Sequence, residues 1–248
     1  MADFEFRTGV MNDKEIVHHF LLDHFRITEP ITVSLDSTEN DVDLFFTDLA
    51  MNGISDEKSS ILVFQQEELV AICLNSVKNF ENPSKNCGGV SFDPHRDFQY
   101  EIENGPYESK NANKLSAFVD VMEQDLDILL EKPKKIFKID VLCVSKIFQG
   151  QGIARRLVEQ SLIIAEKEGC EHVATVATAC ASQAIFRKMG LETLRELPFS
   201  CFRCDGEVVY RDLPDGGVSG KLMVMKLNNE NVGVNLGAGE REEEEDLR

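Results

Sequence analysis

The chain has 248 residues, of which 42% are hydrophobic, so it is long enough to fold as one large domain around a buried core. Its net charge of −18 argues against binding to nucleic acid, and either solubility or attraction of a small cationic molecule explains it. With no apolar run long enough to cross a membrane, no apolar signal segment and seven scattered cysteines, the sequence predicts a cytoplasmic protein without membrane association.

The N-terminal third predicts strands and helices in alternation. In chain order these are a strand within 1–10, a helix at 12–26, a helix at 40–51, and a hairpin of strands near 60–65 and 69–77. The pair Glu29-Pro30 is expected to stop the first helix, because a residue before proline avoids the helical region. The segment 79–106 holds three prolines and three glycines and is expected to be a long, partly irregular connection.

The rest of the chain predicts a parallel pair of strands joined by a helix. The expected elements are a helix at 109–131, a strand at 136–144, a helix ending near 168, a strand at 172–178, a helix at 182–190, a strand from 191 and a last strand at 221–227. This order predicts a mixed α/β single domain over 1–228. The acidic segment 229–248 is expected to be a disordered tail.

A glycine-rich segment, Gln149-Gly150-Gln151-Gly152-Ile153-Ala154, lies between the apolar strand and the helix that follows it. The N-terminus of a helix exposes free N–H groups, and glycines let them approach an anion closely, so the segment can form a phosphate site. A P-loop is excluded because no G-K-[ST] follows. The dinucleotide fingerprint fits only in its first half, since Arg155 occupies the place of the third glycine.

The same segment resembles the acetyl-CoA pyrophosphate loop of the GNAT acyltransferases, [QR]-x-x-G-x-[GA], which also follows a buried strand. The C-terminal part from SQAIFRKMG to KLMVMKL, and HFRITEP near the N-terminus, are similar to the invertebrate arylalkylamine (dopamine) N-acetyltransferases. The resemblance covers about 10–30 and 107–227. It implies a single-domain GNAT acyl-CoA N-acyltransferase fold and transfer of an acetyl group from acetyl-CoA to a primary amine.

The resemblance also implies roles for individual residues. Glu29 is implied as the general base, which an alkylamine needs at neutral pH because its pKa is near that of lysine, roughly 10.4. Thr178 and Ser182 occupy the positions of two family serines near the thioester sulfur, although Ser182 can equally cap its helix. The residues implied to bind acetyl-CoA are Leu142, Cys143, Val144, Gln149, Gly150, Gln151, Gly152, Ile153, Ala154 and Arg155.

Several alternatives stay open at this point. The expected acceptor is a small cationic arylalkylamine such as dopamine, tyramine, octopamine or serotonin, and agmatine or a polyamine is the alternative. The protein, expected to be a monomer, can also be an inactive GNAT-like module that holds CoA, or an NAD-binding oxidoreductase that uses the same glycines. No metal is expected, because the histidines lack ligand spacing and Cys201-x-x-Cys204 has no second pair.

Overall fold

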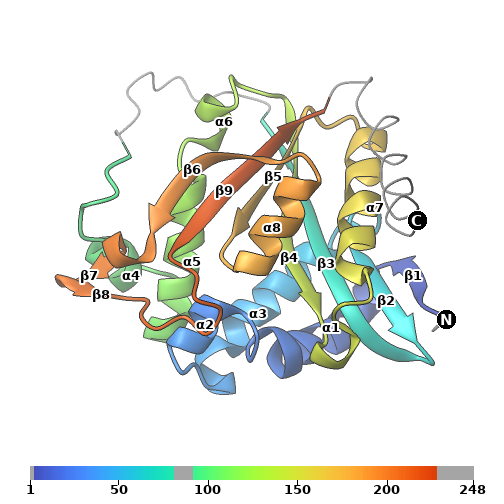
Figure 1. The fold of residues 1–248 in the computed structure, drawn as a ribbon, viewed down its shortest axis with the longest axis horizontal. Helices are drawn as coiled ribbons and strands as arrows, with labels where there is room; N and C mark the ends of the chain where they lie inside the picture. Colours follow the sequence, from blue (N-terminus) through green and yellow to red (C-terminus); the bar gives the residue numbers. More distant parts are fainter. Residues whose placement is uncertain (1–2, 81–91, 228–248) are drawn as a thin grey trace, which may run out of the picture.

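The computed structural model describes residues 3–80 and 92–227, and within them the chain forms a seven-stranded mixed sheet with helices on both faces (Figure 1). The strand order is β1-β2-β3-β4-β5-β9-β6. Among the described strands, β4 and β5 are the only parallel neighbours. The predicted mixed α/β fold with a parallel central pair is therefore confirmed, whereas the predicted tail at 229–248 lies outside the described residues.

The strands fall close to their predicted positions. They are β1 (Glu5–Thr8), β2 (Ile61–Gln65), β3 (Glu68–Asn79), β4 (Lys135–Val144), β5 (His172–Ala177), β6 (Glu192–Pro198) and β9 (Ser219–Lys226), with a separate hairpin of β7 (Arg203–Cys204) and β8 (Glu207–Val208). The predicted hairpin of β2 and β3 is confirmed, and its turn residues Gln66 and Glu67 have positive φ angles. Such a two-residue turn matches the right-handed twist of the strands.

Helices cover the two faces of the sheet unequally. One face carries α7 (Ile153–Lys167) and α8 (Cys180–Lys188), and Leu157, Val158 and Phe186 are buried there. The other face carries η1 (Met11–Asp13), α1 (Lys14–Phe20), the π-helical η2 (Leu21–Phe25), α2 (Pro30–Ser34), α3 (Glu39–Ile54), α4 (Gln99–Glu103), α5 (Lys110–Glu123) and α6 (Leu126–Leu129). Two short 3-10 turns, η3 (Lys146–Phe148) and η4 (Phe199–Cys201), complete the described elements.

The single helix predicted at 109–131 is wrong, because the chain turns between α5 and α6. Gln124 leaves the helical conformation with a ψ of 131°, and Asp125 then has a left-handed φ of 57°, so α5 cannot continue into α6. Arg195 on β6 donates hydrogen bonds from Nη1 to the carbonyl oxygens of Val121, Met122 and Gln124 at 2.9–3.1 Å. These bonds satisfy carbonyl groups that the end of α5 leaves without helical partners, and they stabilise the turn.

Glu29-Pro30 starts a helix as well as following one. The helix predicted at 12–26 is present as η1, α1 and η2, but Glu29 is the N-cap of α2 and Pro30 is its first residue. Proline suits this position because the first N–H groups of a helix have no helical partner. The sequence interpretation, which used the pair only as a stop signal, therefore missed α2.

Candidate active site

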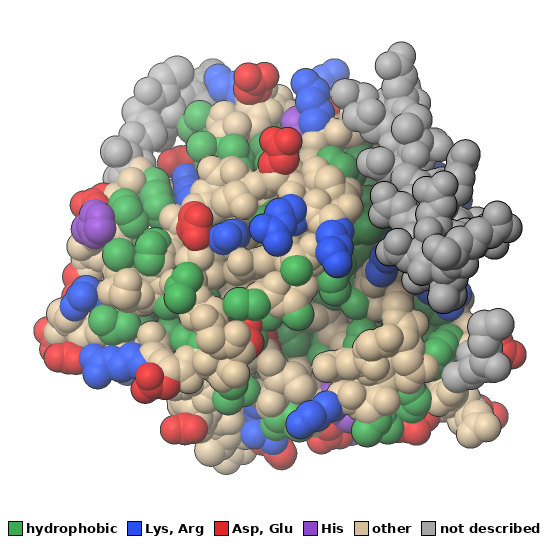
Figure 2. Space-filling view, viewed as in Figure 1, with side chains coloured by type: hydrophobic (Ala, Val, Ile, Leu, Met, Phe, Trp, Pro, Cys, Tyr) green, Lys and Arg blue, Asp and Glu red, His purple; other side chains and the backbone are tan. Residues whose placement is uncertain are grey.

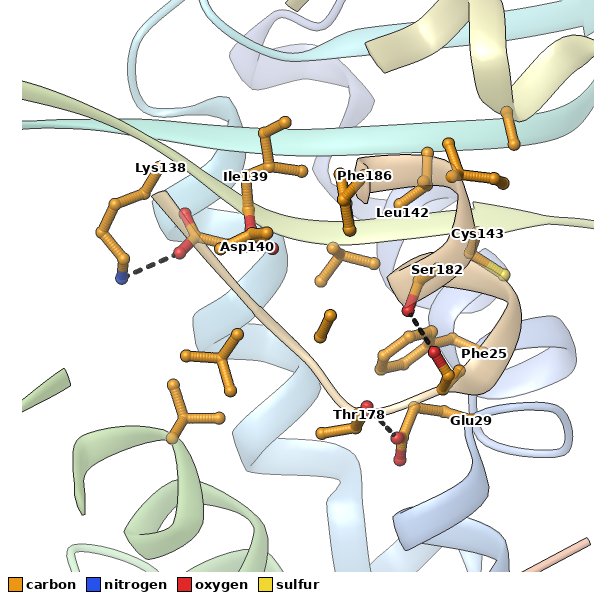
Figure 3. Close-up of a pocket in the computed structure, with 18 of the residues that line it drawn as sticks. Phe25, Glu29, Lys138, Ile139, Asp140, Leu142, Cys143, Thr178, Ser182 and Phe186 are labelled. Carbon is orange, nitrogen blue, oxygen red and sulfur yellow. Dashed lines mark hydrogen bonds and ion pairs between the residues drawn. The ribbon is translucent and has the colours of Figure 1, made fainter. Parts of the chain in front are cut away.

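A cavity of about 1480 Å³ lies at the centre of the sheet and reaches both of its faces (Figure 3). It is bounded by α7 and α8 on one side and by α2, α3 and α5 on the other. This volume exceeds the roughly 300–1,000 Å³ that is usual for a small-molecule site, so it can hold a long ligand and a second small one. The predicted site residues that line it are Glu29, Leu142, Cys143, Val144, Gln149, Gly150, Gly152, Ile153, Ala154, Arg155, Thr178 and Ser182, that is, all except Gln151.

The cavity opens where β4 and β5 separate. These strands pair over Ile136–Lys138 and His172–Ala174, yet β4 continues to Val144 and β5 to Ala177. Beyond the paired part, the edge of β4 that faces β5 has no strand partner in the described residues. Its main-chain N–H and C=O groups are therefore available to an extended ligand lying between the strands.

A β-bulge marks the point of separation. Leu74 on β3 pairs with Val141, whereas the next residue, Asn75, pairs with Ile139, so Asp140 is an extra residue in β4. The Thr175 hydroxyl on β5 donates to the Ile139 carbonyl oxygen at 2.8 Å and fixes the last contact between the two strands. The bulge bends β4 away from β5, and the cavity follows from this bend.

The glycine-rich segment has the backbone shape of an anion cradle. Gly150 and Gly152 have φ angles of 77° and 76°, and a Cβ atom on either would meet no atom of the protein within 4 Å. Gly152 is the N-cap of α7, so the free N–H groups of its first turn are exposed beside the cavity. The Gln149 amide donates to the Val144 carbonyl oxygen at 3.1 Å and holds the segment against the end of β4.

The two arginines that follow the glycine-rich segment, Arg155 and Arg156, both contact other side chains of the protein. Arg155 donates from Nε to Glu159 at 2.8 Å, and the Arg156 guanidinium lies over the ring of Phe6 at 4.1 Å. Arg155 lines the cavity, and its role in binding a phosphate stays a prediction. The backbone of the glycine-rich segment is thus the stronger candidate for an anion contact.

Cationic side chains nevertheless gather on the face of the molecule that carries α8 (Figure 2). Figure 2 shows a row of Lys and Arg side chains across the face that carries α8, and the last turn of α8 contains Arg187 and Lys188. Lys188 and Lys226 line the cavity there. A protein with a net charge of −18 thus presents a local positive region on the face of the sheet that carries α7 and α8 (Figure 2).

Glu29 is buried at the other end of the cavity, with 8% of its surface exposed (Figure 3). Its Oε1 accepts hydrogen bonds from the Thr178 hydroxyl at 2.7 Å and from the Ile31 N–H at 3.3 Å. Its Oε2 accepts from the Thr32 N–H at 2.7 Å and from the Thr32 hydroxyl at 2.5 Å. The carboxylate therefore caps α2 and also contacts the residue that follows β5.

Burial raises the pKa of the Glu29 carboxyl group above its ordinary value, although the four hydrogen bonds act in the opposite direction. A raised pKa brings a carboxylate closer to the range in which it can accept and release a proton near neutral pH. The position of Glu29 fits a group that exchanges protons with a ligand.

Thr178 and Ser182 both line the cavity near Glu29 (Figure 3). Thr178 contacts Glu29 directly, whereas the Ser182 hydroxyl donates to the Ala179 carbonyl oxygen at 2.9 Å. The expectation that Ser182 could be the N-cap is wrong, because α8 begins at Cys180 and Asp215 accepts the Cys180 N–H at 2.7 Å. Both hydroxyl groups thus remain able to donate toward a ligand after a change of rotamer.

The strand residues Leu142, Cys143 and Val144 combine a structural and a ligand-facing role. Cys143 and Val144 are buried, and Leu142 packs against the core beneath α7. Burial raises the pKa of the Cys143 thiol to about 12, so this thiol stays protonated and is a poor nucleophile near neutral pH. As expected, their side chains belong to the core, and binding of a ligand by their open backbone edge stays a prediction.

Sequence reasoning missed several residues that line the part of the cavity near α2, α3 and α5. Thr32 lies three residues after Glu29, a spacing that signals side-chain capping at a helix start. Phe45 and Tyr107 form an edge-to-face pair with centroids 5.5 Å apart, and the Tyr107 hydroxyl donates to Asp48 at 2.9 Å. No local pattern identifies Phe45, Asp48 and Tyr107, because α3 and the segment before α5 meet only in the folded chain.

An ion-pair network forms the floor of the same region. Lys138 Nζ lies 2.8 Å from Glu123 and 2.9 Å from Asp140, and Ser76 donates to Asp140 at 2.5 Å. Lys78 approaches Glu123 at 3.4 Å. Burial lowers the pKa of Lys138, but the two carboxylates outweigh burial and raise it overall, so its charge is retained.

The match to a protein family agrees with this geometry. Residues 74–191, which include β4, the glycine-rich segment, α7, β5 and α8, match the Acetyltransferase (GNAT) family. The chain carries a GNAT acetyltransferase domain. The predicted GNAT fold is confirmed. No curated protein sequence matches the chain significantly.

Solved structures support the GNAT fold over most of the chain. Arylalkylamine N-acetyltransferase 2 from Aedes aegypti is 21% identical, with 91% of this chain and 100% of that chain covered and a TM-score of 0.71. Drosophila melanogaster polyamine N-acetyltransferase, which forms N-acetylagmatine, is 17% identical and has a TM-score of 0.69. The match covers 91% of this chain and 100% of that chain. The C-terminal condensation domain of Ebony, in complex with β-alanyl-dopamine, is 12% identical and has a TM-score of 0.69. The match covers 92% of this chain and 100% of that chain.

Two further observations concern the described residues alone. Over 3–80 and 92–227, no group of three or more His, Cys, Asp or Glu side chains is placed to hold a metal ion. In the same part of the chain, none of the helices combines the length and the apolar character needed to cross a membrane.

Proposed function

We propose that this GNAT domain transfers the acetyl group of acetyl-CoA to a small primary amine, with Glu29 as the general base. The observation that carries the proposal is the single cavity that joins an anion cradle at Gly150–Gly152 to a buried carboxylate at Glu29. The pyrophosphate of acetyl-CoA fits the cradle, and the pantetheine arm fits along the free edge of β4. The thioester would then lie between β4 and β5.

Starting from the ammonium form, two protons leave the nitrogen, of which one reaches the thiol and the other is released to solvent. Glu29 accepts a proton from the ammonium group, and the free nitrogen lone pair attacks the thioester carbonyl carbon. The new C–N bond forms as the C–S bond breaks, and CoA leaves as a thiolate that takes up a proton. The hydroxyl groups of Thr178 and Ser182 line the cavity near Glu29 and are the candidates to donate to the sulfur.

The acceptor end of the cavity supports a cationic amine. Carboxylates outnumber cationic side chains on this side, where the lining includes Glu29, Asp48, Asp120, Glu123 and Asp140 against Lys78 and Lys138. The aromatic rings of Phe25, Phe45 and Tyr107 also line the cavity, and they favour the expected arylalkylamine acceptors. The carboxylates far from Glu29 favour the second candidate, agmatine or a polyamine.

Binding of the donor tests the proposal against its two rivals. Acetyl-CoA and CoA should raise the melting temperature of the protein, whereas NAD should leave it unchanged, because the cradle lacks the third glycine of a dinucleotide site. Stabilisation by NAD and not by CoA would contradict the transferase assignment. Stabilisation by CoA without acetylation of any amine would leave the rival in which the protein is an inactive CoA-binding module.

A further inference from the structure

The acceptor side of the cavity continues well beyond Glu29. It follows the groove between α3 and α5, with β3 and β4 as its floor. Next to Glu29 the lining is apolar, and it consists of Leu49 on α3, Leu115 and Val119 on α5, and Val141 on β4. Beyond this apolar section the lining becomes charged again at Asp120. The cavity therefore has a carboxylate at each end of an apolar middle.

The charges at the far end are unequally compensated. Glu123 and Asp140 are both held by Lys138, and each has a second partner, Lys78 for Glu123 and Ser76 for Asp140. The charges of the two lysines and two carboxylates in this network cancel.

Asp120 does not take part in this ion-pair network. It accepts a hydrogen bond from the Ser116 hydroxyl at 3.3 Å, and no Lys, Arg or His of the described chain lies within 4.0 Å of its carboxylate. Asp120 itself remains exposed to solvent at the wall of the cavity. A cation in the cavity can therefore pair with this carboxylate without displacing a cationic side chain.

The spacing between the two ends can be taken from the elements that line them. Figure 3 shows Glu29 and Cys143 at one end of the view, and Lys138 and Asp140 at the other. Three residues of strand separate Cys143 from Asp140, which corresponds to roughly 10 Å. Leu115 and Asp120 are five residues apart on α5, which corresponds to roughly 7.5 Å along the helix. The apolar section thus has the length of an extended chain of several methylene groups.

We propose that Asp120 binds a second cationic group of the acceptor, so that the cavity selects amines carrying two positive charges joined by an alkyl chain. The reacting amino group lies at Glu29, the methylene chain lies along Leu115, Val119 and Val141, and the distal cation lies at Asp120. This inference rests on the proposed acetyl transfer for the orientation of the amine. It makes α,ω-diamines and polyamines better acceptors than monoamines of equal length.

Paired ligands and paired variants test the subsite. The ligands are α,ω-diamines of increasing length from putrescine upward, each compared with the n-alkylamine that lacks the second amino group, together with spermidine and phenethylamine. The variants are Asp120→Asn, which keeps the shape of the side chain, and Asp127→Asn on α6, which removes a charge outside the cavity lining. Steady-state kinetics give KM and kcat, and calorimetry with the CoA-bound protein gives the affinity for each amine.

The expected result is confined to one variant and one class of ligand. Asp120→Asn should raise KM and weaken binding about fivefold for diamines long enough to span the apolar section, as expected for loss of a solvent-exposed ion pair worth about 1 kcal/mol. The same substitution should leave kcat unchanged, and it should not alter the KM or the affinity for monoamines or the affinity for acetyl-CoA. Asp127→Asn should behave like the wild type with every ligand.

Two results would overturn the subsite: equal effects of Asp120→Asn on a diamine and on its matched monoamine, or no effect on either. The binding measurement separates this outcome from failure of the proposed function. If no amine is acetylated but diamine binding still depends on Asp120, the subsite stands and the transferase activity on these amines does not. If amines are acetylated without any dependence on Asp120, the transferase activity stands and the subsite is wrong.

Discussion

At the scale of single residues, Glu29 has hydrogen-bond donors at all four lone-pair positions of its carboxylate. Two of the donors are backbone N–H groups of α2, which hold the carboxylate in place. The other two are the hydroxyls of Thr32 and Thr178, which can turn away. Proton transfer from an amine to Glu29 therefore requires one hydroxyl to release its hydrogen bond, and Thr178 lies at the cavity wall where this can occur.

Replacing the carboxylate should remove the base and spare the donor site. Glu29→Gln is expected to lower kcat/KM by about 10²–10⁴-fold, the usual contribution of general base catalysis, with the affinity for acetyl-CoA unchanged. In the wild type, kcat/KM should rise with pH through the raised pKa of Glu29, because only the ionised form accepts a proton.

That acidic limb of the pH profile should disappear in Glu29→Gln. Glu15→Gln, an exposed substitution on α1, is the control and should behave like the wild type. An unchanged pH profile in Glu29→Gln would contradict the assignment of the base.

The Thr178 hydroxyl should tune the same titration. Its hydrogen bond favours the ionised form of Glu29, so Thr178→Val, which keeps the volume but removes the hydroxyl, should raise the pKa of Glu29 further. The acidic limb of the kcat/KM profile should then move to higher pH, and Thr178→Ser should restore the wild-type position. Coincident profiles for the Val and Ser variants would show that this hydrogen bond has no part in the titration.

At the scale of elements, α7 offers an internal comparison for the proposed cradle. Gly152 before α7 and Gly169 after it both have positive φ angles, and both have open space where a Cβ would lie. Alanine at either position costs about 1–2 kcal/mol for the left-handed conformation. The two sites therefore carry the same backbone strain, but only Gly152 lines the cavity.

Gly152→Ala should weaken acetyl-CoA binding about tenfold, because the strained backbone turns N–H groups away from the pyrophosphate. Both Gly152→Ala and Gly169→Ala should lower the melting temperature by a similar amount, but Gly169→Ala should leave the affinity for acetyl-CoA unchanged. Calorimetric titration and thermal melting of both variants measure the two effects. Equal affinities in the two variants would place the pyrophosphate elsewhere.

Most elements could be predicted from the sequence because their signals are local. The apolar run of β4, the glycine that ends α7 and the hairpin of β2 and β3 all follow from neighbouring residues. The break between α5 and α6 could not be predicted, since it depends on Arg195, more than 70 residues away in the chain. The start of α2 was predictable in principle from Glu29-Pro30, but the pair carries a stop signal as well.

At the scale of the whole molecule, the separation of β4 and β5 joins two surfaces of opposite charge character. Cations such as Lys188 and Lys226 line the cavity on the α7–α8 side, and carboxylates predominate on the α3–α5 side. An anionic donor and a cationic acceptor can thus approach from opposite faces of the sheet and meet at its centre. The sequence indicated the donor loop and Glu29 through motifs, whereas Asp120 and Tyr107 enter the cavity only through packing of α3 against α5.

Amine-dependent release of CoA thiol from acetyl-CoA is the measurement that tests the central claim most directly. The purified protein, acetyl-CoA and a panel of arylalkylamines, agmatine and polyamines should release thiol and form one equivalent of N-acetylamine, identified by its mass. Omission of the amine should abolish the release. If acetyl-CoA binds but no amine in the panel increases thiol release above that background, the proposed acetyl transfer is contradicted.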